Sequence, residues 1–137
     1  MQEITGEWVD KAESDFAAAH RLMRRREDEP PLVDAVCFHS QQCVEKYLKA
    51  FLQEHNVRFE YKHPLEPLLG QCLSLDASFE ELRQDVVGLE GYAVAVRYPG
   101  AKVTDEMAER ALAAAVRVRA FIHAKLGLDQ PSTPKGA

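Results

Sequence analysis

Residues 37–50 read CFHSQQCVEKYLKA, and the sequence around them repeats its apolar residues at spacings of three and four. This spacing is the period of an α-helix with one buried stripe. The stripe consists of Val33, Cys37, Ser40, Val44, Tyr47, Leu48 and Phe51, and the other side carries Gln42, Glu45, Lys46 and Lys49. We therefore predict a helix from about residue 32 to residue 55, the longest in the chain, with these polar side chains turned away from the core.

The segment before it has the same helical period. Its apolar face consists of Trp8, Ala12, Phe16, Ala19 and Met23. Thr5 precedes this face and is a residue type that caps helix N-termini, while Pro30 and Pro31 interrupt the pattern. The sequence predicts a first helix that starts after Thr5 and ends near the two prolines.

Three further helices are predicted after residue 63. Pro64 suits the first turn of a short helix, whose apolar residues are Leu65, Leu68, Leu69 and Cys72, and residues 74–78 form a turn. The next helix has the most regular spacing, through Phe79, Leu82, Val86, Leu89, Ala93 and Val96. It stops at Pro99 and Gly100, after which Thr104 caps a last helix that Gly127 ends.

Helices joined by short connections, with no strand-like alternation, predict an all-α fold. We expect an antiparallel up-and-down four-helix bundle with an additional short helix, formed by residues 1–127. Residues 128–137 are expected to be a disordered tail, because they are rich in Pro, Ser, Thr and Gly. The N-terminus lacks the order of a signal peptide and no run is long and apolar enough for a membrane span, so we expect a cytoplasmic protein.

The net charge of −5 argues against a generally basic nucleic-acid binder. A local basic site remains conceivable at His20 and Arg21 with residues 24–26, although acidic residues 27–29 follow at once. The alternative is a set of cations that interact with a helix C-terminus. Cys37, Cys43 and Cys72 have no zinc-like spacing, so we expect reduced, partly buried thiols, no metal and no cofactor.

Residues 37–50 resemble the second helix of HEPN domains, in which a Phe-His-x-Gln-Gln-x-x-Glu-Lys-x-x-Lys-Ala pattern is characteristic. Three further parts of the sequence resemble the family and occur in the family's order. The first is Trp8 with Ala12 and Asp15, the second is residues 62–65 with Leu68 and Leu69, and the third is Tyr92 with residues 97–99. The resemblance spans about residues 8–126.

This resemblance implies the HEPN fold and a small prokaryotic protein, usually a homodimer and often paired with a minimal nucleotidyltransferase in toxin–antitoxin-like systems. Some members of the family cleave RNA without metal, and others have been proposed to bind nucleotides. The ribonucleases use an Arg followed four to six residues later by a His. Here Arg97 has no such His, because the next one is His123. The usual acid–base partner is therefore missing.

Arg97 is the candidate catalytic residue, since a guanidinium binds phosphate in a bidentate manner and stabilises charge on it. The alternatives are a cation that interacts with the helix C-terminus and a structural ion pair with a carboxylate such as Glu90 or Asp15. For Asp15 we favour structural pairing with Arg97 or Lys46, because an unpaired carboxylate at a helix seam is costly.

The other candidate nucleotide- or RNA-binding residues are His39, Gln42, Lys46, His63 and Tyr98. The first three share a polar helix face by their spacing; that face could equally be a solvated surface or a dimer contact. His63 stands at a helix start, where anions are favoured, and could instead be a cap. Tyr98 could stack on a base or cover the bundle end.

We therefore expect a component of a toxin–antitoxin-like nucleotidyltransferase/HEPN pair that binds nucleotide or RNA phosphate near Arg97. Two alternatives are a metal-independent ribonuclease with a substitute acid–base group, His39 or His63, and a non-catalytic helical protein-interaction module.

Overall fold

The protein's structure, a computed structural model, describes residues 1–24, 28–29, 32–60 and 64–128, without the side chains of residues 94, 96 and 97. These residues form helices α1 (Glu3–Met23), α2 (Val33–Glu54), α3 (Leu65–Leu75), a 3-10 helix η1 (Ala77–Leu82), α4 (Arg83–Arg97) and α5 (Asp105–Leu126). The described part of the chain contains no strand, so the all-α prediction is confirmed.

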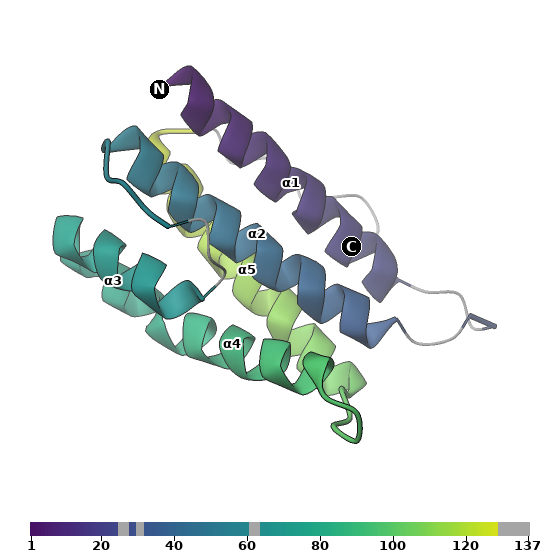
Figure 1. The fold of residues 1–137 in the computed structure, drawn as a ribbon. Helices are drawn as coiled ribbons and strands as arrows, with labels where there is room; N and C mark the ends of the chain where they lie inside the picture. The colour runs from purple at the N-terminus through teal and green to yellow at the C-terminus, as the bar shows by residue number, and fades with distance from the viewer. Residues whose placement is uncertain (25–27, 30–31, 61–63, 129–137) are drawn as a thin grey trace.

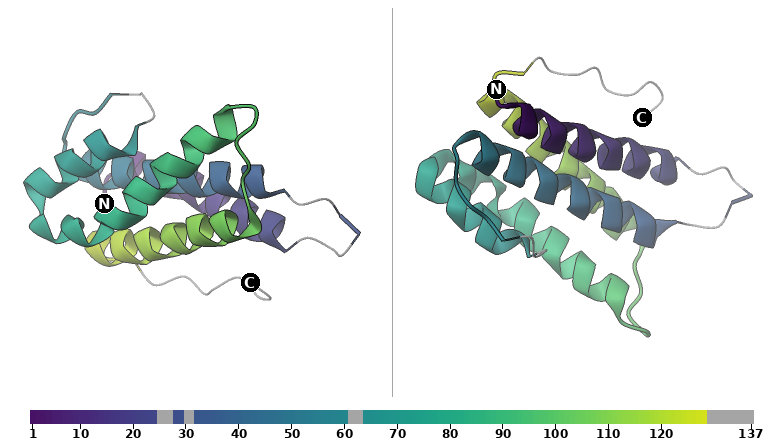
Figure 2. Two further views of the ribbon diagram at one scale, coloured as in Figure 1. Left: turned by 90° about the horizontal axis from the view of Figure 1, so that it is seen from below. Right: turned by 45° about the horizontal axis from the view of Figure 1, so that its top comes forward.

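Helix α2 lies at the centre of the bundle, with α1 on one side, α3 and α4 on the other, and α5 behind it (Figure 1). Successive long helices reverse direction, so that α1 is antiparallel to α2 and α4 is antiparallel to α5. Seen from below, α4 crosses α5 obliquely (Figure 2). The end of α4 and the start of α2 lie at the same end of the bundle in all three views.

The core runs the length of α2, and buried residues of this helix extend beyond the single apolar stripe that the sequence predicted. Its largest fully buried side chains are Tyr47, Phe79, Leu48, Leu52, Leu65, Leu69, Leu89 and Ile122, with four valines. Because helices pack on several sides of α2, Glu45 and Lys49 are only 3% and 2% exposed. The prediction that these two side chains face away from the core is therefore wrong.

Two predictions about the first helix are also corrected. It begins at Glu3, so Thr5 lies inside it; the Thr5 hydroxyl is buried and donates to Glu54 Oε1 at 2.9 Å, tying α1 to the end of α2. The helix ends at Met23, seven residues before the first proline. Arg24, the first residue after the helix, is charged and exposed, so burial of its side chain does not favour a further turn.

The last helix begins and ends as predicted. Thr104 Oγ1 accepts a hydrogen bond from the Met107 amide at 3.1 Å, and Gly127 adopts a left-handed conformation with φ of 69°. Leu128 still packs against the core, and the predicted disorder of residues 129–137 concerns a segment outside the described residues. Within the described part, no helix is long and apolar enough to cross a membrane.

Candidate functional site

The candidate site is an Asp–His–Lys cluster between α1 and α2. Asp15 projects from α1, and its two carboxylate oxygens contact different side chains of α2. Oδ1 lies 2.8 Å from His39 Nδ1, and Oδ2 accepts a hydrogen bond from Lys46 Nζ at 2.5 Å. His39 and Lys46 are seven residues apart, which places them on one side of the helix two turns from each other. One carboxylate thus holds an imidazole and an ammonium group together.

The burial of the three side chains is graded. The Asp15 side chain is 11% exposed, whereas those of Lys46 and His39 are 23% and 30% exposed. An ionised carboxylate only accepts hydrogen bonds, so the Nδ1 of His39 carries the proton toward Asp15. Because Nδ1 is directed at Asp15, Nε2 is the ring nitrogen left for hydrogen bonding or proton transfer. The expected pairing of Asp15 with Lys46 is confirmed, and His39 is a second partner that we did not predict.

Gln42 lies between these two residues on the predicted face. Its side-chain amide is half-buried and donates to the Gln41 Oε1 at 3.0 Å. The structure therefore brings His39, Gln42 and Lys46 onto one partly exposed edge of α2, as their spacing predicted.

The remaining predicted site residues lie elsewhere in the fold. Arg97 is the last residue of α4, but its side chain, like all of His63, lies outside the described residues. Tyr98 follows directly and is 63% exposed, and Gly100, with φ of 91°, turns the chain toward α5. The exposure of Tyr98 favours the reading in which its ring is accessible over the one in which it covers the bundle.

The start of α3, where we considered an anion site, is already occupied by a carboxylate of the chain. Glu90 Oε1 accepts hydrogen bonds from the amides of Leu65 and Glu66, the latter at 3.0 Å. A carboxylate at a helix N-terminus satisfies amides that have no intrahelical partner. Both carboxylates that we considered for Arg97, Glu90 and Asp15, therefore have other partners.

Sequence reasoning missed a second polar cluster, which joins α1, α2 and α5. Tyr47 OH donates to Glu13 Oε1 at 2.6 Å and lies 2.9 Å from His123 Nε2. Arg119 donates to both oxygens of Glu13, at 3.0 and 3.1 Å, and its guanidinium lies 4.1 Å from the centre of the Phe16 ring. A tyrosine in a buried stripe usually has a hydrogen-bond partner for its hydroxyl, so the position of Tyr47 in the predicted stripe could have indicated a buried polar cluster.

This second cluster is largely buried, although the Glu13 side chain is 30% exposed. Burial would raise the pKa of Glu13, but hydrogen bonds from Arg119 and Tyr47 outweigh it and lower that pKa. Burial, and then the Glu13 carboxylate, raise the pKa of Tyr47 far above its usual value. Because Tyr47 is fully buried and His123 only 5% exposed, we interpret the cluster as a brace that fixes three helices together.

The buried pair on α2 is also part of the framework. Lys49 Nζ lies 3.0 Å from Glu45 Oε2, one turn away, and 5.3 Å from the centre of the Trp8 ring. Phe59 completes this contact, with its ring 5.8 Å from Trp8 in an edge-on arrangement. The pair therefore anchors the segment after α2 against α1.

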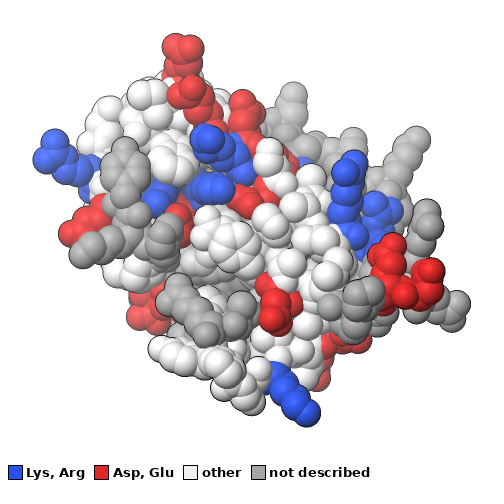
Figure 3. Space-filling view, turned by 45° about the vertical axis from the view of Figure 1, so that its right-hand side comes forward, with Lys and Arg blue, Asp and Glu red and all other residues white. Residues whose placement is uncertain are grey.

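At the end of α1, His20 is not available to an exposed basic patch. His20 is buried beside Phe16, and burial, Arg119 and Arg24 lower its pKa. On the face shown in Figure 3, cationic and anionic side chains are interspersed and neither covers a wide area. A phosphate site among the described residues of this face must therefore be local.

The cysteines are free and are more completely buried than the partly buried thiols that we expected. Burial raises the pKa of Cys37 to about 11 and that of Cys72 to about 12. Among the described residues, no group of His, Cys, Asp and Glu side chains is arranged to hold a metal ion.

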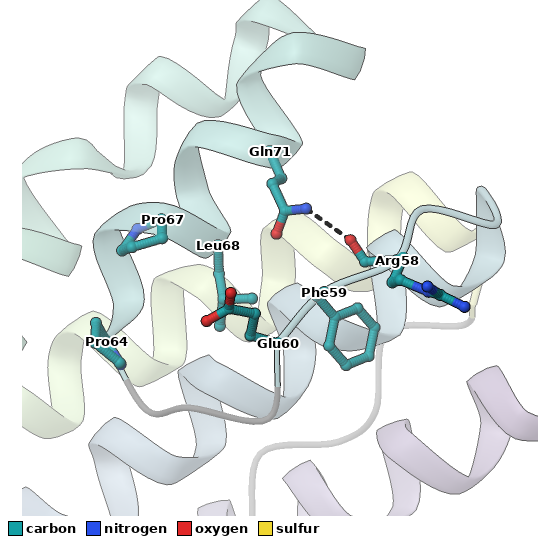
Figure 4. A pocket seen from close by; sticks show the side chains of 7 residues that line it. All are labelled: Arg58, Phe59, Glu60, Pro64, Pro67, Leu68 and Gln71. Atoms are coloured by element: carbon teal, nitrogen blue, oxygen red, sulfur yellow. Dashed lines mark hydrogen bonds between the residues drawn. The ribbon is translucent and has the colours of Figure 1, made fainter.

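A half-open cavity of about 550 Å³ lies between α3 and the extended segment before it (Figure 4). Its described lining includes Phe59, Pro64, Pro67 and Leu68, and Gln71 holds the segment in place by donating to the Arg58 carbonyl at 2.8 Å. Neither His39, Gln42, Lys46 nor Tyr98 lines it.

Comparison with known proteins identifies one family. The HEPN domain model matches residues 5–125, which is most of the chain. No curated protein and no solved structure shows significant similarity.

Proposed function

Because the chain belongs to the HEPN domain family, we propose that it binds RNA or nucleotide phosphate as the HEPN component of a toxin–antitoxin-like pair with a minimal nucleotidyltransferase. The binding edge is formed by His39, Gln42 and Lys46, and Arg97 with Tyr98 completes it. The family fold is common to binding and catalytic proteins, so the proposal depends on the site rather than on the fold.

The observation that carries the proposal is the shared carboxylate of Asp15. It orients the imidazole of His39 and the ammonium of Lys46 side by side, on a part of α2 that retains contact with solvent. Hydrogen bonds from such groups to phosphate oxygens are charge-assisted and stronger than neutral ones. The ammonium of Lys46 and the imidazole of His39 thus offer two N–H-bearing groups to an anion from one edge of α2.

The position of Arg97 supports its inclusion. It ends α4 at the end of the bundle where α2 begins, as Figure 1 shows, and His39 lies in the second turn of α2. We also propose a homodimer, since two-fold symmetry is the commonest arrangement of soluble oligomers and would bring a second copy of the site into the same particle.

The binding proposal is tested by titrating a labelled RNA oligonucleotide, and separately ATP, with the purified protein at low salt. We expect weaker binding by Lys46→Met and by Arg97→Ala. The matched control is Lys125→Met, because Lys125 has a similarly exposed side chain, at 31%, and a similar carboxylate partner, Asp76 at 2.7 Å. Equal losses in Lys46→Met and Lys125→Met would contradict the proposed site.

A second candidate function, metal-independent RNA cleavage, is favoured by the orientation of His39. Asp15 fixes Nδ1, which leaves Nε2 to accept the proton of a ribose 2′-hydroxyl. The 2′-oxygen then attacks the adjacent phosphorus, and the bond to the 5′-oxygen of the next nucleotide breaks. The products are a 2′,3′-cyclic phosphate and, after protonation, a 5′-hydroxyl. Lys46 and Arg97 would stabilise the charge on phosphorus.

Cleavage is tested with end-labelled RNA in the presence of a chelator. We expect that activity, where present, disappears in Arg97→Ala and in His39→Ala and is unchanged in Lys125→Met. Cleavage activity that survives in both His39→Ala and His63→Ala would exclude both histidines as the acid–base group. Absence of cleavage by the wild-type protein, together with RNA binding, would leave the binding proposal as the function.

A further inference from the structure

Phe38 is an aromatic residue of α2 that the core does not use. Phe38 is 53% exposed, whereas Phe16 on α1, Phe51 on α2 and Phe79 on η1 are at most 3% exposed. Exposure of about half of this residue, on a helix that is otherwise largely buried, leaves apolar surface in water. This surface does not contribute to packing among the described residues.

The ring lies directly beside the candidate site. Its centre is 5.2 Å from that of the His39 ring, and the two planes meet at 77°. Phe38, Gln42 and Lys46 follow each other at intervals of four residues, so they form a continuous strip along the helix. The strip presents an aromatic face, then an amide, then a cation, with the imidazole of His39 along its edge.

We infer that Phe38 is a stacking platform for an unpaired base, and that the ligand of this strip is single-stranded RNA. The inference rests on the proposed phosphate site and adds its substrate class. Stacking of bases on aromatic side chains is a general means of binding single strands and tolerates any base. In an RNA duplex the bases are already paired and stacked, so they are not available to the ring.

Stacking on Phe38 would also explain how a site with little net charge binds RNA. Asp15 offsets part of the positive charge of Lys46, so phosphate contacts alone would give limited affinity on an acidic protein. A stacked base adds a contribution that does not depend on charge. Binding should therefore retain a component that persists as salt concentration rises, and that component should belong to Phe38.

The inference is tested by fluorescence anisotropy with a labelled, unstructured 12-nucleotide RNA, with the same RNA annealed to its complement, and with AMP as a competitor. We expect Phe38→Ala to weaken single-strand binding by about 5- to 150-fold, the range found for loss of one stacked base. Phe38→Tyr, which retains the ring, should bind like the wild type. Duplex RNA should bind more weakly and respond little to Phe38→Ala.

Val87→Ala is the matched control, because Val87 is an exposed apolar residue, at 49%, on α4. Single-strand binding that is equal in wild type and Phe38→Ala, but lost in Lys46→Met, would overturn the stacking role and leave the phosphate site intact. Failure of the wild type to bind any RNA would overturn the inference, and failure to bind both RNA and nucleotide would overturn the proposed function. A change from dimer to monomer in Phe38→Ala, measured by light scattering, would mean that a second copy covers the ring and would also overturn the inference.

Discussion

Replacing Asp15 by Asn tests the cluster that the candidate site depends on. The substitution keeps the size of the side chain and one carbonyl oxygen, but it replaces the second oxygen with an NH2 group that cannot accept a hydrogen bond. In the wild type, both oxygens accept from positively charged or ring N–H groups, at 2.5 Å from Lys46 and 2.8 Å from His39. Asp15→Asn therefore loses one of these bonds and the attraction between unlike charges.

A hydrogen bond to a charged group contributes about 1.5–3 kcal/mol when buried. Here Lys46 and His39 are 23% and 30% exposed, so water can solvate them after the substitution. We therefore expect a loss of about 1–2 kcal/mol in the free energy of unfolding, below the roughly 3–5 kcal/mol that breaking a fully buried ion pair costs. With a urea dependence of about 2 kcal/mol per M, the unfolding midpoint falls by roughly 0.5–1 M.

The assay is urea unfolding at pH 7, followed by circular dichroism at 222 nm. The control is Glu106→Gln, the same change of carboxylate to amide in an exposed helical pair with Arg110, in which both side chains are 67% exposed; its effect should be below about 0.5 kcal/mol. A double-mutant cycle with Lys46→Met should show a coupling of about 0.5 kcal/mol or more. A midpoint for Asp15→Asn no lower than that of Glu106→Gln would refute the reasoning.

Three further predictions concern the framework. Tyr47→Phe removes a buried hydroxyl that contacts Glu13 and His123, and should lower the free energy of unfolding by about 1.5–3 kcal/mol in urea. Tyr98→Phe should change it little, and similar losses in the two variants would contradict the role of the Tyr47 cluster in holding the helices together. Burial lowers the pKa of His20 below its usual 6.5, so the folded state favours the neutral ring, and stability should fall as the pH drops through 6.5. His20→Gln should reduce this pH dependence of the melting temperature between pH 7 and pH 5, and an unchanged slope would exclude His20 as its source. Burial and raised pKa values should protect the three thiols, so that a disulfide reagent at pH 8 modifies them at least about tenfold more slowly in the native protein than in denaturant; rapid native modification would show that they are accessible.

Local sequence signals predicted the helices well because each is encoded by neighbouring residues. Apolar periodicity located the five α-helices, although the first turn of the predicted fourth helix, Phe79 to Leu82, belongs to the 3-10 helix η1, which also takes the end of the turn predicted at residues 74–78. The Thr104 cap and the Gly127 end were readable from single residues. The end of α1 was misplaced because proline marks where a helix must stop, whereas packing decides where it does stop. Thr5 was misread because its actual partner, Glu54, is 49 residues away.

The same distinction applies to the candidate site. Spacing alone placed His39, Gln42 and Lys46 on one face of α2, since the helix fixes that geometry, and the cost of burying a carboxylate predicted a partner for Asp15. Neither argument identified His39 as the second partner of Asp15, because that contact depends on how α1 packs against α2. The Glu13–Tyr47–Arg119–His123 cluster joins three helices and was equally invisible along the chain.

The sequence by itself thus determined an all-helical chain of the HEPN family, the order of its helices and one polar face of α2. Only the tertiary structure decided which polar residues are buried, as with Glu45 and Lys49, and which aromatic ring is left exposed, as with Phe38. The physical reason is that periodicity reports the sides of one helix, whereas burial depends on how many neighbours pack around it. Helix α2 has neighbours on several sides, so a polar position in its sequence is not necessarily a position in water.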